Sequence, residues 1–237
     1  MIIGAGQQFP RNNSHCVFQL QNGSGTTFTD TGAGRAGNRS GDVHSTGTAW
    51  TEHVQTTGEP FTSCISYDGT DDYLTFGTSA DFNPYNSNYT WEFFWKPVNL
   101  QEQMFFAYYY LDINTYFNYL SFKDTNAGII TQNKFNGIDY AFFKENAAET
   151  GVTGYNINQC YHIAMVKNGL NWKVFRDGKQ IITGDSTEEK NHNGNGTLYI
   201  GSSWAPNKFV YGAIANIRFH KGIALWTRNF TPPNRAS

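Results

Sequence analysis

Short runs of alternating apolar and polar residues, separated by Gly, Asn and Asp, recur along nearly the whole chain. A period of two is the pattern of a strand that buries one face, and the 3.6-residue period of an amphipathic helix is nearly absent. Asn168-Gly169 and Asp177-Gly178 are dipeptides typical of tight turns between paired strands. The pattern therefore predicts an all-β fold built from antiparallel strands.

The expected strands are spread evenly along the chain. They lie at 16–20, 61–66, 73–76, 90–96, 104–110, 116–122, 128–131, 140–144, 161–167, 172–176, 180–183, 197–201 and 213–220. This many short strands at such spacing predicts a two-sheet antiparallel β-sandwich. Residues 1–15 are predicted to form a polar N-terminal arm, residues 16–237 a single domain, and the Gly-rich stretch 31–47 a long surface loop.

Composition supports a folded protein and narrows its partners. Aromatic residues make up 16% of the chain and charged residues only 15%, which disfavours disorder. The formal net charge of −2 gives no broad attraction to nucleic acid or to an anionic lipid surface. No apolar run approaches the length of a membrane helix, and the cysteines have no metal-binding spacing. We therefore expect buried free thiols, no nucleic-acid partner and no membrane insertion.

Six segments, in the same order, resemble the laminin-G-like domains of the concanavalin A-like jelly-roll family. The turn at 67–74, YDGTDDYL, resembles the family's FDGxDDYL, and 89–97, YTWEFFWKP, resembles FTIEFWVKP. The other four segments are YHIA at 161–164, FRDGK at 175–179, LYIG at 198–201 and GAIANIR at 212–218. The resemblance covers residues 16–233 and implies a concanavalin A-like jelly roll.

The end of the chain resembles a narrower group within this family. Residues 28–30 and the segment 222–233, GIALWTRNFTPP, are similar to domains of tailed-bacteriophage structural proteins. This resemblance implies a non-enzymatic virion protein, either a capsid decoration subunit or a tail accessory subunit at the virion surface. Its expected partners are other virion proteins, contacted through the N-terminal arm, and further copies of itself in a homo-oligomer.

Glycan binding is a second function that the residues favour. Sugar recognition needs exposed aromatic rings beside polar groups, and the loop at 202–208 together with Tyr211 has this mixture. Trp204, Asn207 and Tyr211 are the candidate binding residues, although Trp204 suits a core-capping role equally well. A displayed lectin would bind a host-surface glycan, and a carbohydrate-binding module or adhesin outside any particle is the alternative.

A glycan hydrolase is the third function considered. Such an enzyme needs two carboxyl groups about 5–10 Å apart across a cleft. No strand carries the alternating acids of the glucanases, because Glu92 stands alone between Trp91 and Phe93 and Glu145 lies in a polar stretch. We therefore expect no catalytic residues.

Asp68, Asp71 and Asp72 place three carboxylates within five residues. Oxygen ligands from such a loop suit Ca²⁺. Asp68 and Gly69 are also the residues that a tight turn requires, because Asp bonds to the following backbone and Gly adopts a positive φ. We interpret this segment as a structural turn without a cofactor, and a calcium site is the alternative.

The segment 104–110, MFFAYYY, is too aromatic on both faces for one side to be freely solvated. Either it is buried on both sides within the chain or a partner subunit covers one side. Tyrosines are common at interfaces, which favours the second interpretation. Phe105, Tyr108 and Tyr110 are therefore the interface candidates.

Overall fold

The computed structural model describes residues 16–20, 43–46, 49–52, 63–83, 87–110, 116–125, 127–135, 138–146, 154–188, 196–203, 205 and 207–232. In these residues the chain forms strands, one 3-10 turn at Ala80–Phe82 and no α-helix, which confirms the all-β prediction. No helix in this part of the chain is long and apolar enough to cross a membrane. The predicted arm, 1–15, lies outside the described residues.

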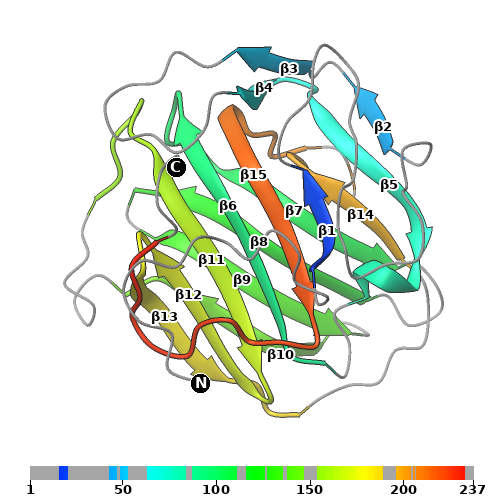
Figure 1. Ribbon diagram of the computed structural model, residues 1–237, viewed down its shortest axis with the longest axis vertical. Helices are drawn as coiled ribbons and strands as arrows, with labels where there is room; N and C mark the ends of the chain where they lie inside the picture. Colours follow the sequence, from blue (N-terminus) through cyan, green and yellow to red (C-terminus); the bar gives the residue numbers. More distant parts are fainter. Residues whose placement is uncertain are drawn as a thin grey trace.

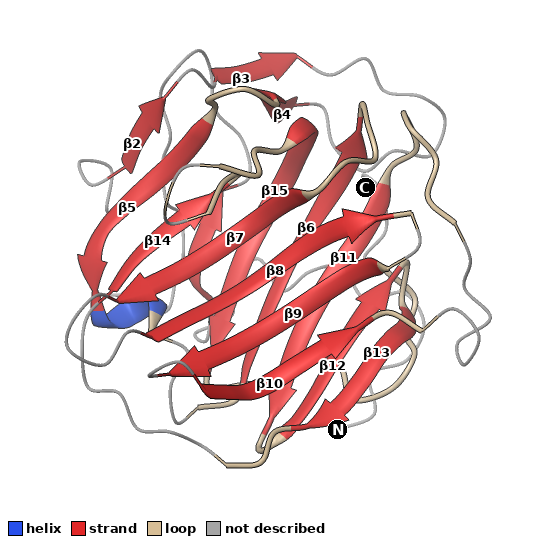
Figure 2. Ribbon diagram, turned by 180° about the vertical axis from the view of Figure 1, so that it is seen from behind, coloured by secondary structure: helices blue, strands red, loops and turns tan. Residues whose placement is uncertain are grey.

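Two antiparallel sheets pack face to face (Figures 1 and 2). The eight-stranded sheet has the order β13 (Lys179–Asp185), β12 (Asn171–Arg176), β11 (Tyr161–Asn168), β6 (Tyr89–Pro97), β15 (Tyr211–Lys221), β4 (Ser63–Asp68) and β3 (Ala49–Glu52), and β1 (Cys16–Leu20) also pairs with β15. The seven-stranded sheet has the order β10 (Ile138–Lys144), β9 (Gly128–Phe135), β8 (Tyr116–Asp124), β7 (Gln103–Tyr110), β14 (Gly196–Ile200), β5 (Tyr73–Ser79) and β2 (Val43–Thr46). This arrangement is the predicted two-sheet sandwich.

The structure differs from the predicted strands mainly near the N-terminus. β2 lies inside the stretch 31–47 that we predicted to be a loop, and β3 was not predicted at all. Each has only four residues and pairs with one longer strand, β2 with β5 and β3 with β4. Such short strands form because a neighbour offers its backbone groups, so their own sequences carry little alternation to detect.

Aromatic rings from β6 fill the space between the sheets. Trp91 stacks on Phe106 of β7 with ring centroids 4.5 Å apart, and the Phe93 ring lies 5.0 Å from that of Phe105. Burying one large apolar side chain stabilises a fold by about 1.5–3 kcal/mol, so this layer is a major source of stability. Of the cysteines, Cys64 and Cys160 are buried free thiols, as predicted.

The core also holds two of the predicted interface residues. Phe105 and Tyr108 are only 1% and 2% exposed, so the interface prediction is wrong for them. A bulge between Met104 and Phe106 makes Phe105 the extra residue in β7 and turns its ring inward. The Tyr108 hydroxyl accepts a hydrogen bond from the Gly196 N–H at 2.6 Å. Tyr110 is half-buried against the core, and its interface role stays a prediction.

After β15 the chain crosses the outer face of the eight-stranded sheet, as the red segment in Figure 1 shows. We call residues 222–232 the strap. The rings of Trp226 and Phe230 stack with centroids 4.1 Å apart and pack against an outward-facing patch that includes Phe175. The Phe230 N–H donates to the Gly178 carbonyl oxygen at 2.9 Å. The strap therefore covers side chains of β11 and β12 that would otherwise be solvated.

Candidate functional site

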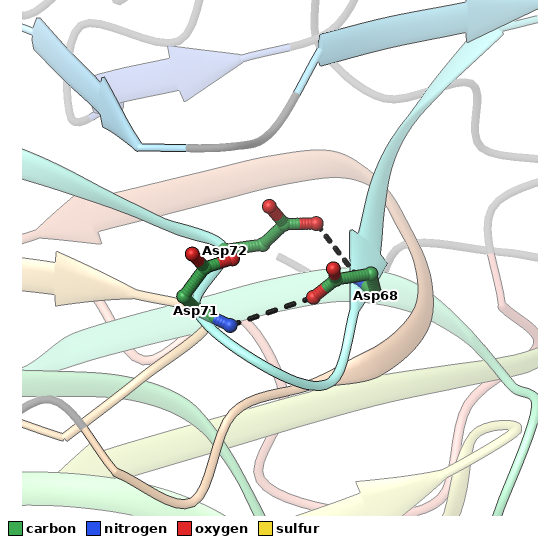
Figure 3. Close-up of side chains that lie close together, drawn as sticks. All are labelled: Asp68, Asp71 and Asp72. Atoms are coloured by element: carbon green, nitrogen blue, oxygen red, sulfur yellow. Dashed lines mark hydrogen bonds between the residues drawn. The ribbon is translucent and has the colours of Figure 1, made fainter.

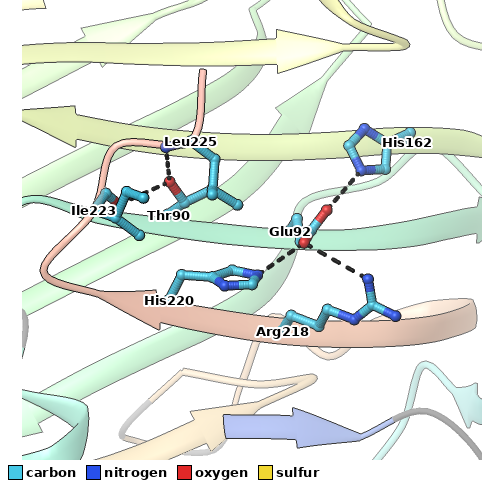
Figure 4. Close-up of polar contacts among 7 residues, drawn as sticks. All are labelled: Thr90, Glu92, His162, Arg218, His220, Ile223 and Leu225. Carbon is cyan, nitrogen blue, oxygen red and sulfur yellow. Dashed lines mark hydrogen bonds and ion pairs between the residues drawn. The ribbon is translucent and has the colours of Figure 1, made fainter. Parts of the chain in front are cut away.

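A charged cluster lies on the outer face of the eight-stranded sheet, beneath the strap (Figure 4). Trp91 and Phe93 of β6 face the core, so Glu92 between them faces outward. Glu92 Oε1 lies 2.9 Å from His220 Nε2, and Glu92 Oε2 lies 3.3 Å from His162 Nε2. Arg218 Nη1 adds a longer ion pair, 3.9 Å from Glu92 Oε1. Three neighbouring strands, β6, β11 and β15, therefore meet at one carboxylate.

The cluster holds Glu92 in its ionised form. Burial alone would raise the pKa of this carboxyl, but hydrogen bonds from His162 and His220, with the charges of His220 and Arg218, outweigh burial and lower the pKa to about 2. The Nδ1 atoms of both histidines have no hydrogen-bond partner in the described structure. We therefore assign a proton to Nε2 in each ring, because this atom faces the carboxylate.

This cluster is closed to a substrate. Glu92 is 0% exposed, and the rings of Trp226 and Phe230 stand edge-on to the His162 ring, with centroids 5.9 and 5.8 Å away. A general acid must come within hydrogen-bond distance of its substrate. In the described structure the Glu92 carboxylate therefore stabilises the outer face of the sheet beneath the strap, and it is not accessible to react with a substrate.

Polar contacts anchor the strap along its length. The Thr90 hydroxyl contacts the strap backbone twice: it donates to the Ile223 carbonyl at 3.2 Å and accepts from the Leu225 N–H at 3.0 Å (Figure 4). Farther along, Lys173 Nζ donates to the Thr227 carbonyl at 2.6 Å. The Asn229 side chain then accepts a hydrogen bond from the Gln180 N–H at 2.9 Å. These contacts fix residues 227–229 beside β12 and β13.

An open cleft of about 560 Å³ lies where the strap meets the edges of the two sheets. β13 and β10 are the last strands of their sheets on the same side of the sandwich, and the Thr187 N–H links them by donating to the Tyr140 carbonyl at 3.3 Å. The lining residues are Lys144, Asn146, Lys173, Gln180, Ile181, Ile182, Thr183, Thr227, Arg228 and Asn229. We call this space the strap cleft. Its volume is in the range of small-ligand sites.

Apart from Ile181 and Ile182, the described lining of the strap cleft is polar or cationic. Its charged residues are Lys144, Lys173 and Arg228, and none of the ten lining residues is an acid. The nearest acid in sequence, Glu145, turns inward instead. Its Oε2 accepts hydrogen bonds from the Tyr155 hydroxyl at 2.6 Å and from the Ile129 N–H at 3.1 Å. The cleft can therefore hold polar or anionic groups, but its described lining lacks the carboxylate pair of a glycosidase.

The three aspartates of the predicted calcium alternative do lie together (Figure 3). The oxygens of Asp68 and Asp72 accept hydrogen bonds from the backbone of the turn itself. Asp68 Oδ1 accepts from the N–H groups of Thr70 at 2.7 Å and Asp71 at 3.4 Å, and Asp72 Oδ2 accepts from the Asp68 N–H at 2.7 Å. Burial, and then the neighbouring Asp68 and Asp71 charges, raise the pKa of Asp72 despite that hydrogen bond. The geometry is that of a hydrogen-bonded turn, with Gly69 at φ +80°.

The predicted sugar-binding residues are placed only in part. Trp204 lies outside the described residues. Asn207 is exposed, and its side-chain oxygen accepts a hydrogen bond from Ser203 Oγ at 2.7 Å. Tyr211 is 38% exposed and lies over the aspartate turn, where a Cβ on Gly69 would come too close to its side chain. Neither Asn207 nor Tyr211 lines the strap cleft, and the role of all three residues in binding stays a prediction.

The strap cleft could not be predicted from local sequence patterns because its lining comes from separate segments. Lys144 ends β10, Lys173 lies in β12, and Arg228 lies in the strap. No local spacing joins them. The segment 222–233 stands out in the sequence and contains the strap, but it says nothing about what the strap packs against.

Structures that share the fold include proteins that hold or process sugars. Domain 4 of a GH43 extracellular arabinanase from Geobacillus stearothermophilus, in complex with arabinotriose, matches with a TM-score of 0.54 and 14% identity over 76% of this chain and 77% of that one. The binding domain of botulinum neurotoxin DC in complex with SialylT matches with a TM-score of 0.55 and 15% identity, over 91% of this chain and 50% of that one. A Trypanosoma rangeli sialidase mutant with trans-sialidase activity matches with a TM-score of 0.54 and 11% identity, over 92% of this chain and 31% of that one.

These identities show a shared fold and nothing finer, and this chain spans half or less of the toxin and sialidase chains. A search of curated proteins gives no match. A family model for the concanavalin A-like lectin/glucanase superfamily matches residues 68–225, from the aspartate turn to the strap. That match covers more than half of the chain, and both sheets have the antiparallel sandwich order described above. The protein therefore belongs to the concanavalin A-like lectin/glucanase superfamily.

Proposed function

We propose that this protein is a non-enzymatic glycan-binding module displayed on a bacteriophage particle, and that the strap cleft is its sugar site. The observation that carries the proposal is the cleft itself. It is open, about 560 Å³ in volume, and lined by amide, hydroxyl and cationic side chains. Such groups can hydrogen-bond the hydroxyls of a sugar in several orientations.

Binding rather than hydrolysis is favoured by the chemistry of the acids. A glycosidase needs an acid and a second carboxylate on opposite sides of the scissile bond. The strap cleft has neither among its lining residues, Glu92 is closed off by the strap, and Glu145 is bonded to Tyr155. The lectin-like fold and the sugar-bound arabinanase domain support a binding role.

The particle assignment rests on the sequence of the strap. The motif at 222–233 resembles phage structural proteins, and the same segment forms one wall of the cleft through Thr227, Arg228 and Asn229. We propose a capsid decoration or tail accessory subunit at the virion surface, attached through residues 1–15 and assembled as a homo-oligomer. The alternative is a carbohydrate-binding module or adhesin that is not built into a particle.

A glycan array tests the binding role. Thr183→Trp places a large side chain in the strap cleft at an exposed position, so it should abolish binding without unfolding the protein. Thr70→Trp, at an exposed position in the aspartate turn, is the matched control and should bind normally. Trp204→Ala tests the loop site instead. Loss of binding in Trp204→Ala alone would move the site to that loop, and no binding to any glycan would reject the function.

The virion role has a separate test. Particles purified by density gradient from cells that express the chain should contain it by mass spectrometry, and deletion of residues 1–15 should remove it. Particles that lack the full-length chain would reject the virion role while leaving glycan binding intact.

A further inference from the structure

The cations of the strap cleft come from three different segments and point to one kind of ligand. Lys144 ends β10, Lys173 lies in β12, and Arg228 lies in the strap. None of the three makes an ion pair with a described residue. The chain as a whole carries a formal charge of −2, so an excess of basic residues does not explain this grouping.

Three lysines elsewhere on the described surface have acidic neighbours. Lys123 and Lys208 both contact Glu102, with N–O distances of 2.8 and 3.0 Å, and Lys134 contacts Asp139 at 3.9 Å. The strap cleft differs because its described lining holds three cations and no acid. An anion entering it would gain attraction without displacing an existing partner.

The three cations are also held in different ways. Lys173 donates one N–H to the Thr227 carbonyl, which positions its ammonium while leaving two further donors. Lys144 and Arg228 are exposed and unpaired with any described acid. Arginine offers a planar fork that fits a carboxylate with two parallel hydrogen bonds, and lysine supplies a compact charge. Neighbouring Gln180 and Thr183 provide groups for sugar hydroxyls.

We propose that the strap cleft selects anionic saccharides, with Lys144, Lys173 and Arg228 binding the acidic group and the amide and hydroxyl side chains binding the ring. This inference rests on the proposed glycan-binding function and narrows its ligand class. The shared chemistry is a sugar that carries a carboxylate or a phosphate.

The test compares matched pairs of glycans by calorimetry. A panel of uronate-bearing and sialylated oligosaccharides is measured beside the carboxyl-reduced, neutral form of each, and a set of phosphorylated oligosaccharides is measured beside the dephosphorylated forms. We expect at least one acidic form to bind about tenfold more tightly than its neutral partner, with affinity falling as salt is raised because exposed charges are screened. The preferred pair identifies the anion.

Charge variants supply the internal control. Lys144→Gln with Arg228→Gln removes two cations of the cleft and should weaken binding of the acidic form about tenfold, and by a larger factor than it weakens binding of the neutral form. Lys123→Gln with Lys208→Gln removes the same number of positive charges, here beside Glu102, and should change the affinity for either form very little. Equal binding of acidic and neutral forms would overturn the selectivity alone. No binding of any glycan would overturn the proposed function as well.

Discussion

The carboxylate of Glu92 accepts a hydrogen bond from the Nε2–H of His220 at 2.9 Å, in a place that solvent does not reach. His162 and Arg218 approach the same carboxylate from other strands. Because a buried charge is tolerated only when it is paired, each member of the cluster depends on the others. The strap closes the cluster from above, so the charged contacts and the strap packing form one structural unit.

Glu92 should make the protein sensitive to acid. Its pKa falls from an ordinary 4.5 to about 2 in the folded state, so its contribution is fully present above pH 4.5 and is lost as the pH falls toward 2. The shift corresponds to about 3 kcal/mol. Urea denaturation at several pH values should show this loss in the wild type. Glu92→Gln should be destabilised by about 3 kcal/mol at pH 7 and should lack the additional loss in acid. If the free energy of unfolding of the variant fell with pH as steeply as that of the wild type, this assignment would be contradicted.

Thr90→Val should loosen the strap. The variant keeps the shape of the side chain and removes the hydroxyl that bonds to Ile223 and Leu225. Losing two hydrogen bonds at a buried hydroxyl should cost about 1–3 kcal/mol in the free energy of unfolding. Hydrogen exchange should speed up across residues 222–232. Thr75→Val, at a half-buried position of β5, is the control and should leave strap exchange as it is.

Gly178→Ala should destabilise the fold by more than the strain of its positive φ alone explains, because the new side chain also displaces the strap. Gly178 has φ +76°, and a Cβ there would overlap the carbonyl oxygen of Phe230. Gly169 occupies the neighbouring hairpin turn at φ +59° with open space around it, so Gly169→Ala measures the cost of the backbone conformation alone. We expect about 1–2 kcal/mol for Gly169→Ala and at least about 1 kcal/mol more for Gly178→Ala by chemical denaturation. Equal costs would mean that the strap does not press on this turn.

The aspartate turn should not depend on calcium. Asp71 is exposed and accepts none of the hydrogen bonds that hold the turn, so Asp71→Asn should relieve repulsion and leave the thermal midpoint equal or slightly higher. Adding calcium or a chelator should leave the midpoint of wild type and variant unchanged. A calcium-dependent rise that disappears in Asp71→Asn would establish a metal site. Asp68→Ala, which removes the acceptor for Thr70 and Asp71, should cost about 1 kcal/mol.

Much of the fold was predictable because strand signals are local. A period of two and an Asn-Gly turn need only adjacent residues, and the pair β11–β12 formed as the turn at Asn168-Gly169 predicted. The short edge strands β2 and β3 were missed because their pairing is decided by β5 and β4. The burial of Phe105 was missed for a related reason, since a bulge shifts the alternation by one residue.

The candidate site was much harder to predict because its contacts are distant in sequence. Glu92 looked like a lone acid, yet its partners His162 and His220 lie 70 and 128 positions away. The same holds for Lys173, whose strap partner Thr227 is 54 positions away. Local pattern says which face of a strand a residue occupies. It does not say which neighbouring strand, or which later segment, will lie against that face.

Because the strap supplies a wall of the cleft, ligand binding and strap docking are thermodynamically coupled. Any ligand that contacts Thr227, Arg228 or Asn229 binds only chains whose strap is docked, and it must shift that equilibrium toward the docked state. At a ligand concentration one hundred times its dissociation constant the gain is about 2.7 kcal/mol. The amide protons of residues 222–232 would then exchange more slowly whenever the cleft is filled. Hydrogen exchange in the strap, which covers the outer side of Glu92, therefore reports whether a ligand is bound.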